Sequence, residues 1–454
     1  MQTIDSLGPL RMVVDTLRAD HVGIYGNPRQ PTPNIDALAR EGHWFTRAYA
    51  QSGWTLPSMT SLLTGLYPHV HRVGRAPFNE SAFGRLEHSR VTMAEALKAK
   101  GYSTGGFVNN TFMAPEFGLD QGFDTYDYQG ATNDQHRTAE DTMVAANAWL
   151  SQHKGPVFLL VHVMEPHMDY APPQATRGTY TGDGVPLVPL PFASPMQIEE
   201  KDAGGIPAPA VVEYIRQLYD EEILATDQAL SSLFDVLRSR GNWDNTLVVV
   251  TSDHGEEFWD HGGFEHGHSL LGFLTRIPLI MAGGLAEQRA PVKSVVQHVD
   301  VFHTLLLAAG VGLPPETSGV DLRDTKAIPE QMALSENTLY GPPRLSMVDR
   351  DYRLEMNLEE MGGAVYRVLP DGRERRVGGA AQQEQGLRLE GGIRAVRGGL
   401  MPVDTVTGPS VPSVEAFQQL KALGYIEGGP EPTDPADPEE SETSLPGVAN
   451  PPGG

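Results

Sequence analysis

Two strongly apolar runs constrain this chain more than any other feature of its sequence. Val157–Val163 and Thr246–Thr251 are rich in Val and Leu and show no regular alternation of polar and apolar residues. Strands that are buried on both faces have this pattern, and such strands are typical of parallel sheets. Similar short runs alternate along the chain with longer helix-like segments. This order predicts an α/β fold in which a central, mostly parallel sheet carries helices on both faces.

The expected elements follow from hydrophobic periodicity and from helix start and stop signals. We expect strands at Leu10–Val14, Ser103–Val108, Val157–Val163, Thr246–Thr251 and Ile277–Met281. We expect helices at Thr32–Gly42, Thr92–Lys100, Glu140–Gln152 and Val211–Arg240, and residues 295–307 continue the alternation. In such sheets, ligands bind beyond the carboxyl ends of the strands. The polar residues at such ends are Asp15, Glu165, His167, Asp253 and His254.

Residues 52–65 are expected to form a turn that leads into a helix. Pro57 suits the first helical turn, and Gly65 provides the end. Thr55 then lies just ahead of the helix, where unpaired backbone N–H groups and the helix dipole stabilise an anion. Its hydroxyl is therefore a candidate nucleophile. A capping role alone is the alternative for this threonine.

Adjacent Asp253 and His254 predict a metal site on the loop after a buried strand. On a continuing strand they would point to opposite faces, so both can face one ion only on a loop. A hard oxygen beside an imidazole nitrogen favours zinc or manganese over calcium. Three histidines follow this pair within a short stretch. A further candidate segment places a carboxylate and a histidine directly after an expected strand. The alternative for that segment is that its polar residues only mark the end of the strand. These additional residues are His261, His266, His268, Glu165 and His167.

Composition narrows the range of functions. The chain has 454 residues and a formal net charge of −24, which argues against a nucleic-acid partner. It has no cysteine, so disulfides and thiolate chemistry are excluded. No apolar run approaches the roughly 18 residues that a membrane-spanning helix needs. The start of the sequence has no signal-peptide pattern, but its first strand looks truncated, so the compartment stays undetermined and export remains possible.

The pattern changes along the chain in a way that suggests three regions. We expect a catalytic domain at residues 10–332, a small antiparallel subdomain at residues 333–425, and a disordered acidic tail at residues 426–454. The tail carries seven acidic residues and no Lys or Arg. Residues 171–209 are rich in Pro and Gly, and they are expected to form either a lid or a disordered insertion.

Several segments together resemble the sulfatase family of the alkaline phosphatase superfamily. They include the opening at Val14–His21, the nucleophile signature at Thr55–Gly65, and the metal segment at Ser252–Glu256. The remaining matching segments, in the family's order, are Tyr25–Gly26, Thr32–Ala39, Gly118–Asp124, Glu165–His167, His266–Leu270 and the ending Leu420–Tyr425. The resemblance implies an alkaline-phosphatase-like sandwich and an ester hydrolase that handles small-molecule, glycan-derived or lipid-derived anionic esters.

The sequence departs from the sulfatase pattern at four positions. Typical sulfatases convert a cysteine or serine to formylglycine where this chain has Thr55, and threonine cannot yield that aldehyde. Met59 replaces an arginine, Thr16 replaces an aspartate, and His254 replaces a frequent asparagine. These changes resemble the threonine-nucleophile branch of the superfamily, which includes phosphodiesterases and phosphoethanolamine transferases and uses zinc or manganese.

The resemblance also implies roles for individual residues. One divalent cation, zinc or manganese with calcium possible, would be shared by Asp15, Thr55, Asp253 and His254. Thr55, His167 and His266 would be catalytic, and a second ion is possible near Glu165, His167 and His266. Asn109, Asn110 and His268 would contact the substrate anion.

Three functions remain open from the sequence. The first is a metal-dependent hydrolase of phosphate, phosphonate or sulfate esters that forms a covalent Thr55 ester. The second is a transferase that moves a phosphoryl-alcohol group to a lipid or glycan, against which the absence of an apolar spanning run counts. The third is an inactive metal-binding homologue. The sequence does not determine the oligomeric state.

Overall fold

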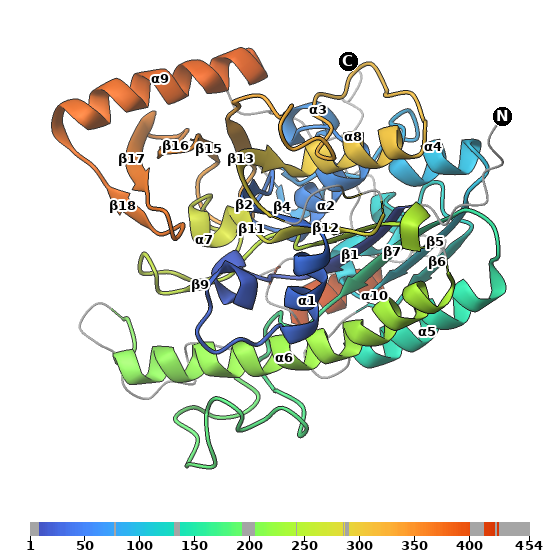
Figure 1. Cartoon of the computed structure of the whole chain (residues 1–454). Coiled ribbons are helices and arrows are strands. Elements are labelled where there is room, and N and C mark those ends of the chain that lie inside the picture. The colour runs from blue at the N-terminus through green and yellow to red at the C-terminus, as the bar shows by residue number, and fades with distance from the viewer. Residues whose placement is uncertain are drawn as a thin grey trace, which may run out of the picture.

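The computed structural model describes residues 9–76, 79–130, 137–192, 205–241, 243–284, 286, 290–399, 413–422 and 425. Within this part of the chain, a nine-stranded sheet carries helices on both faces (Figure 1). A five-stranded antiparallel sheet packs beside it. The predicted α/β architecture with a C-terminal antiparallel unit is therefore confirmed.

The large sheet is parallel over most of its width. Its strand order is β11-β2-β12-β8-β1-β7-β5-β6, and β13 pairs with β2. The neighbours β8, β1, β7, β5 and β6 run parallel, whereas β12 is antiparallel to β8. The strands span Pro9–Val14 (β1), His43–Tyr49 (β2), Ser103–Val108 (β5), Thr125–Tyr128 (β6), Val157–Val163 (β7), Leu247–Thr251 (β8), Arg276–Ile277 (β11), Leu279–Ala282 (β12) and Pro291–Gln297 (β13). The carboxyl ends of the five parallel strands therefore share one edge.

Two apolar layers hold the helices against the large sheet. On β1, Val13 packs into one layer, and Met12 and Val14 pack into the other, because successive side chains point to opposite faces. The first layer includes α2, α4 and α8, and the second includes α1, α5 and α6. These helices span Pro33–Glu41 (α1), Thr55–Thr64 (α2), Met93–Ala99 (α4), Ala139–Gln152 (α5), Pro209–Ser239 (α6) and His298–Ala308 (α8). Shorter elements are α3 (Pro68–His71), α7 (Gly272–Thr275), β3 (Arg75–Ala76), β4 (Asn79–Phe83), β9 (Glu257–Phe258) and β10 (Phe264–Glu265).

The structure differs from the sequence prediction at both sides of the large sheet. Strands β2 and β6 were not expected, and β2 pairs with three strands, β11, β12 and β13. The single strand expected at Ile277–Met281 is instead two strands, β11 and β12, separated by Pro278. A proline has no backbone N–H to donate to a ladder, which explains the break.

The second sheet is made of five consecutive antiparallel strands. They span Ala333–Glu336 (β14), Arg344–Val348 (β15), Tyr352–Asn357 (β16), Gly362–Val368 (β17) and Glu374–Arg376 (β18). The helix α9 (Gly379–Arg397) packs on this sheet through Leu389 and Ile393. The sequence suggests an antiparallel pair at Tyr352–Met356 and Ala364–Leu369, which corresponds to β16 and β17, and it does not indicate α9. The unit begins at Ala333, which is where the predicted subdomain begins.

The helix α10 (Val414–Ala422) returns to the large sheet. Phe417 and Leu420 belong to the same apolar layer as α2 and α8, and Tyr425 joins that layer. The sequence suggests a closing helix at Ser413–Leu423, which corresponds to α10, but this helix packs with the large sheet rather than with the second sheet. The predicted acidic tail, residues 426–454, lies outside the described residues.

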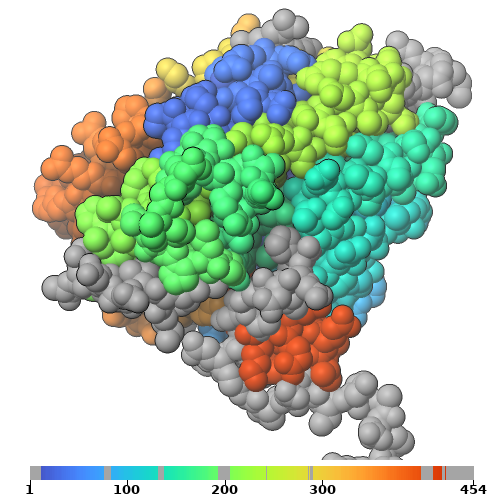
Figure 2. All heavy atoms as spheres, turned by 90° about the horizontal axis from the view of Figure 1, so that it is seen from below, coloured from blue at the N-terminus to red at the C-terminus, as the bar shows by residue number. Residues whose placement is uncertain are grey.

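Residues 171–192 cover part of α6. The Glu221 carboxylate accepts from the backbone N–H groups of Tyr180 and Thr181, and Glu222 accepts from that of Ala171. Figure 2 shows this segment in green on the face of the molecule that is seen from below. Of the two alternatives for residues 171–209, disorder does not apply to residues 171–192, whereas residues 193–204 lie outside the described part of the chain. None of the helices in the described ranges is both long and apolar enough to cross a membrane.

Candidate active site

The carboxyl ends of β1, β5 and β8 meet the start of α2 at one place. Asp15 follows β1, Asn110 lies just beyond β5, and Asp253 and His254 lie just beyond β8. Thr55 is the first residue of α2, and all five side chains are buried. The structure therefore brings together the four residues that the sequence proposes as metal ligands, and it adds Asn110 to them.

The hydroxyl of Thr55 faces this cluster. Trp54 occupies the N-cap position of α2 without a side-chain cap, so Thr55 lies one residue further into the helix than expected. Its Oγ1 lies 3.3 Å from His254 Nε2 and 3.3 Å from Asn110 Nδ2. Gly65 ends the helix with φ at 68°, as the sequence predicts. Thr55 therefore combines a helix N-terminus with polar partners from two other strand ends, which a simple capping residue does not do.

The hydrogen bonds of His254 direct a nitrogen lone pair into the cluster. Its Nδ1 lies 2.9 Å from the carbonyl oxygen of Gly255, which can only accept, so Nδ1 carries a hydrogen. In the neutral ring Nε2 is then an acceptor, and it lies 3.3 Å from Asp253 Oδ2 and 3.7 Å from Asp15 Oδ1. Among the described residues, neither of these carboxylate oxygens has a hydrogen-bond donor. Three electron-rich atoms therefore face one another, and a cation would relieve their repulsion.

The raised pKa of Asp15 also indicates that this cluster is suited to a cation. Burial, followed by the negative charge of Asp253, raises the pKa of the Asp15 carboxyl well above its ordinary value. Asn110 partly opposes this effect, because its Nδ2 donates to Asp15 Oδ2 at 2.6 Å. Two carboxylates buried together are costly without a positive partner. The oxygen and nitrogen donors of this cluster therefore fit a divalent cation.

His162 belongs to this cluster although sequence analysis missed it. It lies on β7, is fully buried, and places Nε2 3.7 Å from Asp15 Oδ2. Asp15, His162 and Asp253 each offer a ligand atom, and these atoms lie within 4.8 Å of one another. Burial lowers the pKa of His162 to about 4, so the ring is neutral and able to bind a metal. The available signal was one polar side chain inside the apolar run Val157–Val163.

A second polar group adjoins the metal-type cluster. The His266 ring lies 4.6 Å from the His254 ring and 5.0 Å from the His167 ring. The hydroxyl of Tyr425 lies between the two histidines of this group, 2.6 Å from His167 Nε2 and 3.1 Å from His266 Nε2. On its other side, His266 Nδ1 lies 3.0 Å from Glu256 Oε1. The structure thus places both predicted catalytic histidines beside His254 and adds Tyr425 and Glu256.

Hydrogen positions in this second polar group can be assigned by starting from His167. His167 Nδ1 lies 2.6 Å from the carbonyl oxygen of Met168 and must donate to it. Burial, then the neighbouring His266, lowers the pKa of His167 to about 3, so its Nε2 is an acceptor. Tyr425 therefore donates to His167 Nε2. Burial raises the pKa of Glu256 to about 6. Burial also lowers the pKa of His266 well below its ordinary value, so its neutral ring carries one hydrogen.

Asn109 takes a structural position instead of the expected substrate contact. Its Nδ2 donates to Thr142 Oγ1 and to the carbonyl oxygen of His162, and its Oδ1 accepts from Arg137 Nε. All of these contacts tie β5 to β7 and α5. We therefore leave Asn109 out of the group that contacts substrate and retain Asn110.

Two further predicted residues have partners away from Thr55. His268 Nε2 lies 2.6 Å from Glu257 Oε2, and its side chain is 29% exposed. The Glu165 carboxylate accepts from the backbone N–H of Ala139 at the start of α5. The contacts of His268 give no support to a role in anion binding, and those of Glu165 give none to a second ion. Both roles stay predictions.

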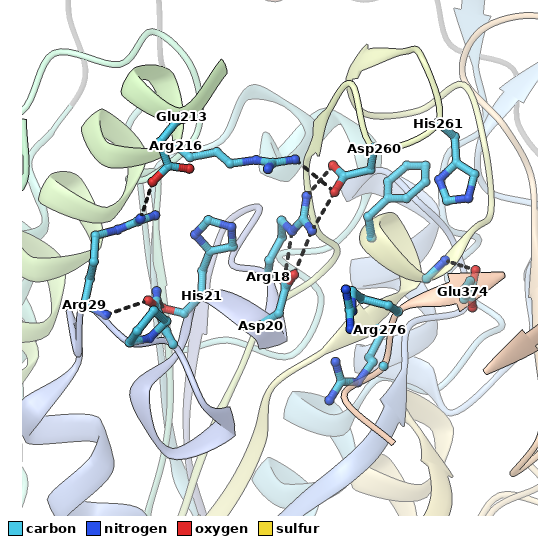
Figure 3. A pocket seen from close by; sticks show the side chains of 16 residues that line it. Arg18, Asp20, His21, Arg29, Glu213, Arg216, Asp260, His261, Arg276 and Glu374 are labelled. Atoms are coloured by element: carbon cyan, nitrogen blue, oxygen red, sulfur yellow. Dashed lines mark hydrogen bonds and ion pairs between the residues drawn. The ribbon is translucent and has the colours of Figure 1, made fainter. Parts of the chain in front are cut away.

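Arg18 braces the loop that carries Glu256. Its guanidinium donates to the Glu256 carbonyl oxygen at 2.9 Å and forms ion pairs with Asp20 and Asp260, both at 2.8 Å. Figure 3 shows Arg18 between these two carboxylates in a cavity of about 380 Å³. In the described chain, the lining of this cavity does not include Thr55 or the residues that surround it. Arg18 therefore supports the site without facing Thr55.

Comparison with known proteins identifies the family. The model of the sulfatase family matches residues 11–311. An arylsulfatase of Clostridium perfringens is 24% identical over 69% of this chain and 77% of its own length. A Delta 4,5-hexuronate-2-O-sulfatase of Bacteroides thetaiotaomicron is 27% identical over 68% of this chain and 70% of its own length. The phosphonate monoester hydrolase of Agrobacterium radiobacter has a similar fold, with a TM-score of 0.70, 19% identity, and coverage of 86% of this chain and 94% of that one. The match to the family model spans more than half of the chain and includes the strand ends at which the buried cluster forms, and the chain therefore belongs to the sulfatase family of ester hydrolases.

Proposed function

We propose that this protein hydrolyses phosphate, phosphonate or sulfate esters with Thr55 as its nucleophile. The observation that supports this most strongly is the position of the Thr55 hydroxyl. It lies at the start of α2 and 3.3 Å from His254 Nε2, beside the buried carboxylates of Asp15 and Asp253. A hydroxyl in this position meets both the positive end of a helix and a cluster suited to a divalent cation.

The chain's own groups provide most of the chemistry. Thr55 Oγ1 would attack the phosphorus or sulfur atom in line with the leaving oxygen, so that the Thr55 ester forms as the bond to the leaving alcohol breaks. Asn110 Nδ2 and the free N–H groups of the first turn of α2 are placed to donate to the other oxygens of the ester. A divalent cation, with zinc or manganese favoured by the oxygen and nitrogen donors, would lower the pKa of the Thr55 hydroxyl and offset the charge of the ester. Water would then cleave the Thr55 ester and release the Thr55 oxygen.

Thr55 favours phosphorus esters as substrates. Its Cβ carries a methyl group, so oxidation would give a ketone and not the aldehyde of formylglycine. The hydrated-aldehyde route of typical sulfatases is therefore closed, and a phosphodiester or phosphonate ester becomes the preferred substrate. Sulfate esters stay in the proposal because the two relatives are named as sulfatases.

The test is a substrate panel with matched threonine variants. Aryl sulfate, phosphate, phosphonate and phosphodiester esters are assayed with zinc, manganese or calcium, using the wild type, Thr55→Ala and Thr55→Ser. Thr64→Ala is the control, because Thr64 lies in the same helix and, within the described ranges, its hydroxyl bonds only to the Thr60 carbonyl and the Leu66 N–H. We expect Thr55→Ala to lose at least about 10³-fold in kcat, with Thr64→Ala unchanged.

Trapping the intermediate makes the result decisive. Rapid quenching and peptide mass spectrometry should find the phosphoryl or sulfuryl group on Thr55. Retained turnover in Thr55→Ala would assign the nucleophile to another residue. Appearance of product only in the presence of an acceptor alcohol would show a transferase instead of a hydrolase.

A further inference from the structure

Tyr425 links the C-terminal part of the chain to the two catalytic histidines. It lies more than 150 positions after His266 in the sequence, yet its hydroxyl lies 2.6 Å from His167 Nε2 and 3.1 Å from His266 Nε2. Sequence analysis gave this tyrosine no chemical role. Both imidazoles turn their site-facing nitrogen toward the same phenol oxygen, which makes that oxygen the meeting point of the group.

Tyr425 is held firmly in this position. Its backbone N–H donates to the Leu420 carbonyl oxygen, and its ring lies 4.9 Å from that of Phe112. Phe417 and Leu420 of α10 belong to the apolar layer beside α2, and Tyr425 itself is 7% exposed. Moving the phenol out would return this apolar surface to water. A substrate therefore meets Tyr425 in place.

The directions of the hydrogen bonds determine what Tyr425 offers to a substrate. With Tyr425 in place, His167 Nε2 accepts its hydrogen and His266 Nε2 lies 3.1 Å from its oxygen, so the phenol covers both imidazole nitrogens. A short series of contacts connects the phenol to the nucleophile. His266 lies against the His254 ring, and His254 Nε2 lies 3.3 Å from Thr55 Oγ1. The phenol O–H thus lies one imidazole ring away from the histidine that contacts Thr55 Oγ1.

We propose that the Tyr425 hydroxyl, rather than either imidazole, delivers the proton to the leaving oxygen. This inference rests on the proposed function, because it assigns the second proton-handling group of that same reaction. A phenol has a reference pKa of about 10 and so keeps its proton at neutral pH. The phenol is therefore protonated when a substrate binds. It can give its proton to the leaving alkoxide, because an alkoxide is a much stronger base than a phenolate.

The proton balance closes within the chain. As the bond from phosphorus or sulfur to the leaving oxygen breaks, the Tyr425 proton moves to that oxygen and leaves a phenolate. Thr55 enters and leaves each turnover as an alkoxide, so its own proton does not enter the balance. In the second half of the reaction, the attacking water gives its proton to the Tyr425 phenolate, by microscopic reversibility. The enzyme is restored without any other reactant.

The experiment compares leaving groups in Tyr425→Phe. This change removes the hydroxyl and keeps the ring that packs on Phe112. A leaving group such as 4-nitrophenolate departs without protonation, whereas a simple alkoxide requires it. We expect kcat/KM to fall less than about 5-fold for 4-nitrophenyl esters and at least about 100-fold for alkyl esters. Thr55→Ala should affect both ester classes equally.

Tyr126→Phe is the matched control. Tyr126 is a partly buried tyrosine beside the same apolar layer, and among the described residues its hydroxyl donates only to the Met113 carbonyl oxygen. Equal loss for both ester classes in Tyr425→Phe would reduce Tyr425 to a structural role, and a gain in rate would show that it blocks the site. Either result overturns the proposal.

Two further measurements keep the test complete. If Tyr425→Phe does not fold, 3-fluorotyrosine at position 425 keeps the hydroxyl and makes it more acidic. An altered dependence of rate on leaving-group basicity then supports the proposal, and an unaltered one refutes it. A wild-type protein without Thr55-dependent turnover would refute the proposed function itself, and the role of Tyr425 would fall with it.

Discussion

Replacing Asp253 with asparagine should change the stability of this protein in opposite directions with and without metal. In the metal-free protein, Asp253 Oδ2 has no donor from the part of the chain that the structure describes, and it faces Asp15 within the same buried cluster. An asparagine oxygen can still accept from the backbone N–H of His254, which Asp253 Oδ1 does at 2.9 Å. The amide nitrogen would replace the unpaired oxygen, and it can donate to Asp15. The variant thus loses a repulsion and keeps a hydrogen bond.

The size of the effect follows from the geometry. Ligand atoms of Asp15 and Asp253 lie within 4.8 Å of each other. Two unit charges at that distance repel by about 3.5 kcal/mol at an effective dielectric constant of 20. Partial protonation of Asp15, whose pKa is raised, relieves part of this repulsion. We therefore expect Asp253→Asn to be about 1–2 kcal/mol more stable than the wild type in chelator.

Metal should reverse this order. A ligand at 100 times its Kd stabilises the native state by about 2.7 kcal/mol. Loss of one carboxylate ligand weakens binding, so at the same metal concentration the variant gains only a fraction of this energy. Free energies of unfolding are measured by urea titration, once with chelator and once with zinc or manganese. Asp235→Asn is the control. Asp235 is 80% exposed, so its replacement should leave both curves unchanged.

Two outcomes would contradict this reasoning. If Asp253→Asn is less stable than the wild type in chelator, the two carboxylates do not repel each other in the metal-free state. If the variant and the wild type gain equal stability from metal, Asp253 is not a ligand. The buried cluster predicts that Asp253→Asn is the more stable protein in chelator and that the wild type is the more stable protein in metal.

Two other predictions concern residues outside the proposed first set of ligands. His162→Phe keeps the volume of the ring but removes a nitrogen 3.7 Å from Asp15, so it should weaken metal binding by about 10- to 100-fold, as measured by calorimetric titration; unchanged affinity would make His162 a filler of the core. Burial raises the pKa of Asp300 to about 7. The native state therefore keeps a proton on this carboxyl at pH values where the unfolded chain, with the ordinary pKa of an aspartate, has released it. Wild-type stability should accordingly fall as the pH rises between about 4 and 7. Asp300→Asn removes this loss, and its stability relative to the wild type should improve by a few kcal/mol from pH 4 to pH 8 in urea titrations; parallel curves would show that Asp300 is ionised in the native protein.

The central sheet could be predicted because its strands are apolar on both faces. Runs such as Val157–Val163 leave little choice of structure, and the polar residues that follow them necessarily lie at one edge of a parallel sheet. Asp15, Asp253 and His254 were proposed in this way and Thr55 from the expected helix start, and family motifs added to both arguments. β2 was missed because three of its seven residues, His43, Thr46 and Arg47, are polar, and its partners β12 and β13 come more than 230 positions later.

The rest of the site depends on contacts that no local pattern encodes. His162 lies inside a strand and was read as part of the core, although its ring reaches Asp15. Tyr425 follows a short helix whose packing partner, the layer beside α2, cannot be read from its own sequence. Asn109 and Asn110 are neighbours of the same type, and only the structure shows that Asn109 bonds to α5 while Asn110 contacts Thr55.

The position of β1 has a consequence for how the molecule is made. This early strand lies at the centre of the large sheet, between β7 and β8, which begin at Val157 and Leu247. During synthesis its apolar residues must wait for both partners to leave the ribosome, so one side of this strand stays unpaired until β8 has been made. Tyr425 emerges later still. A ribosome stalled before that point should hold a chain whose sheet is assembled but which cannot yet release an alkyl alcohol from its ester.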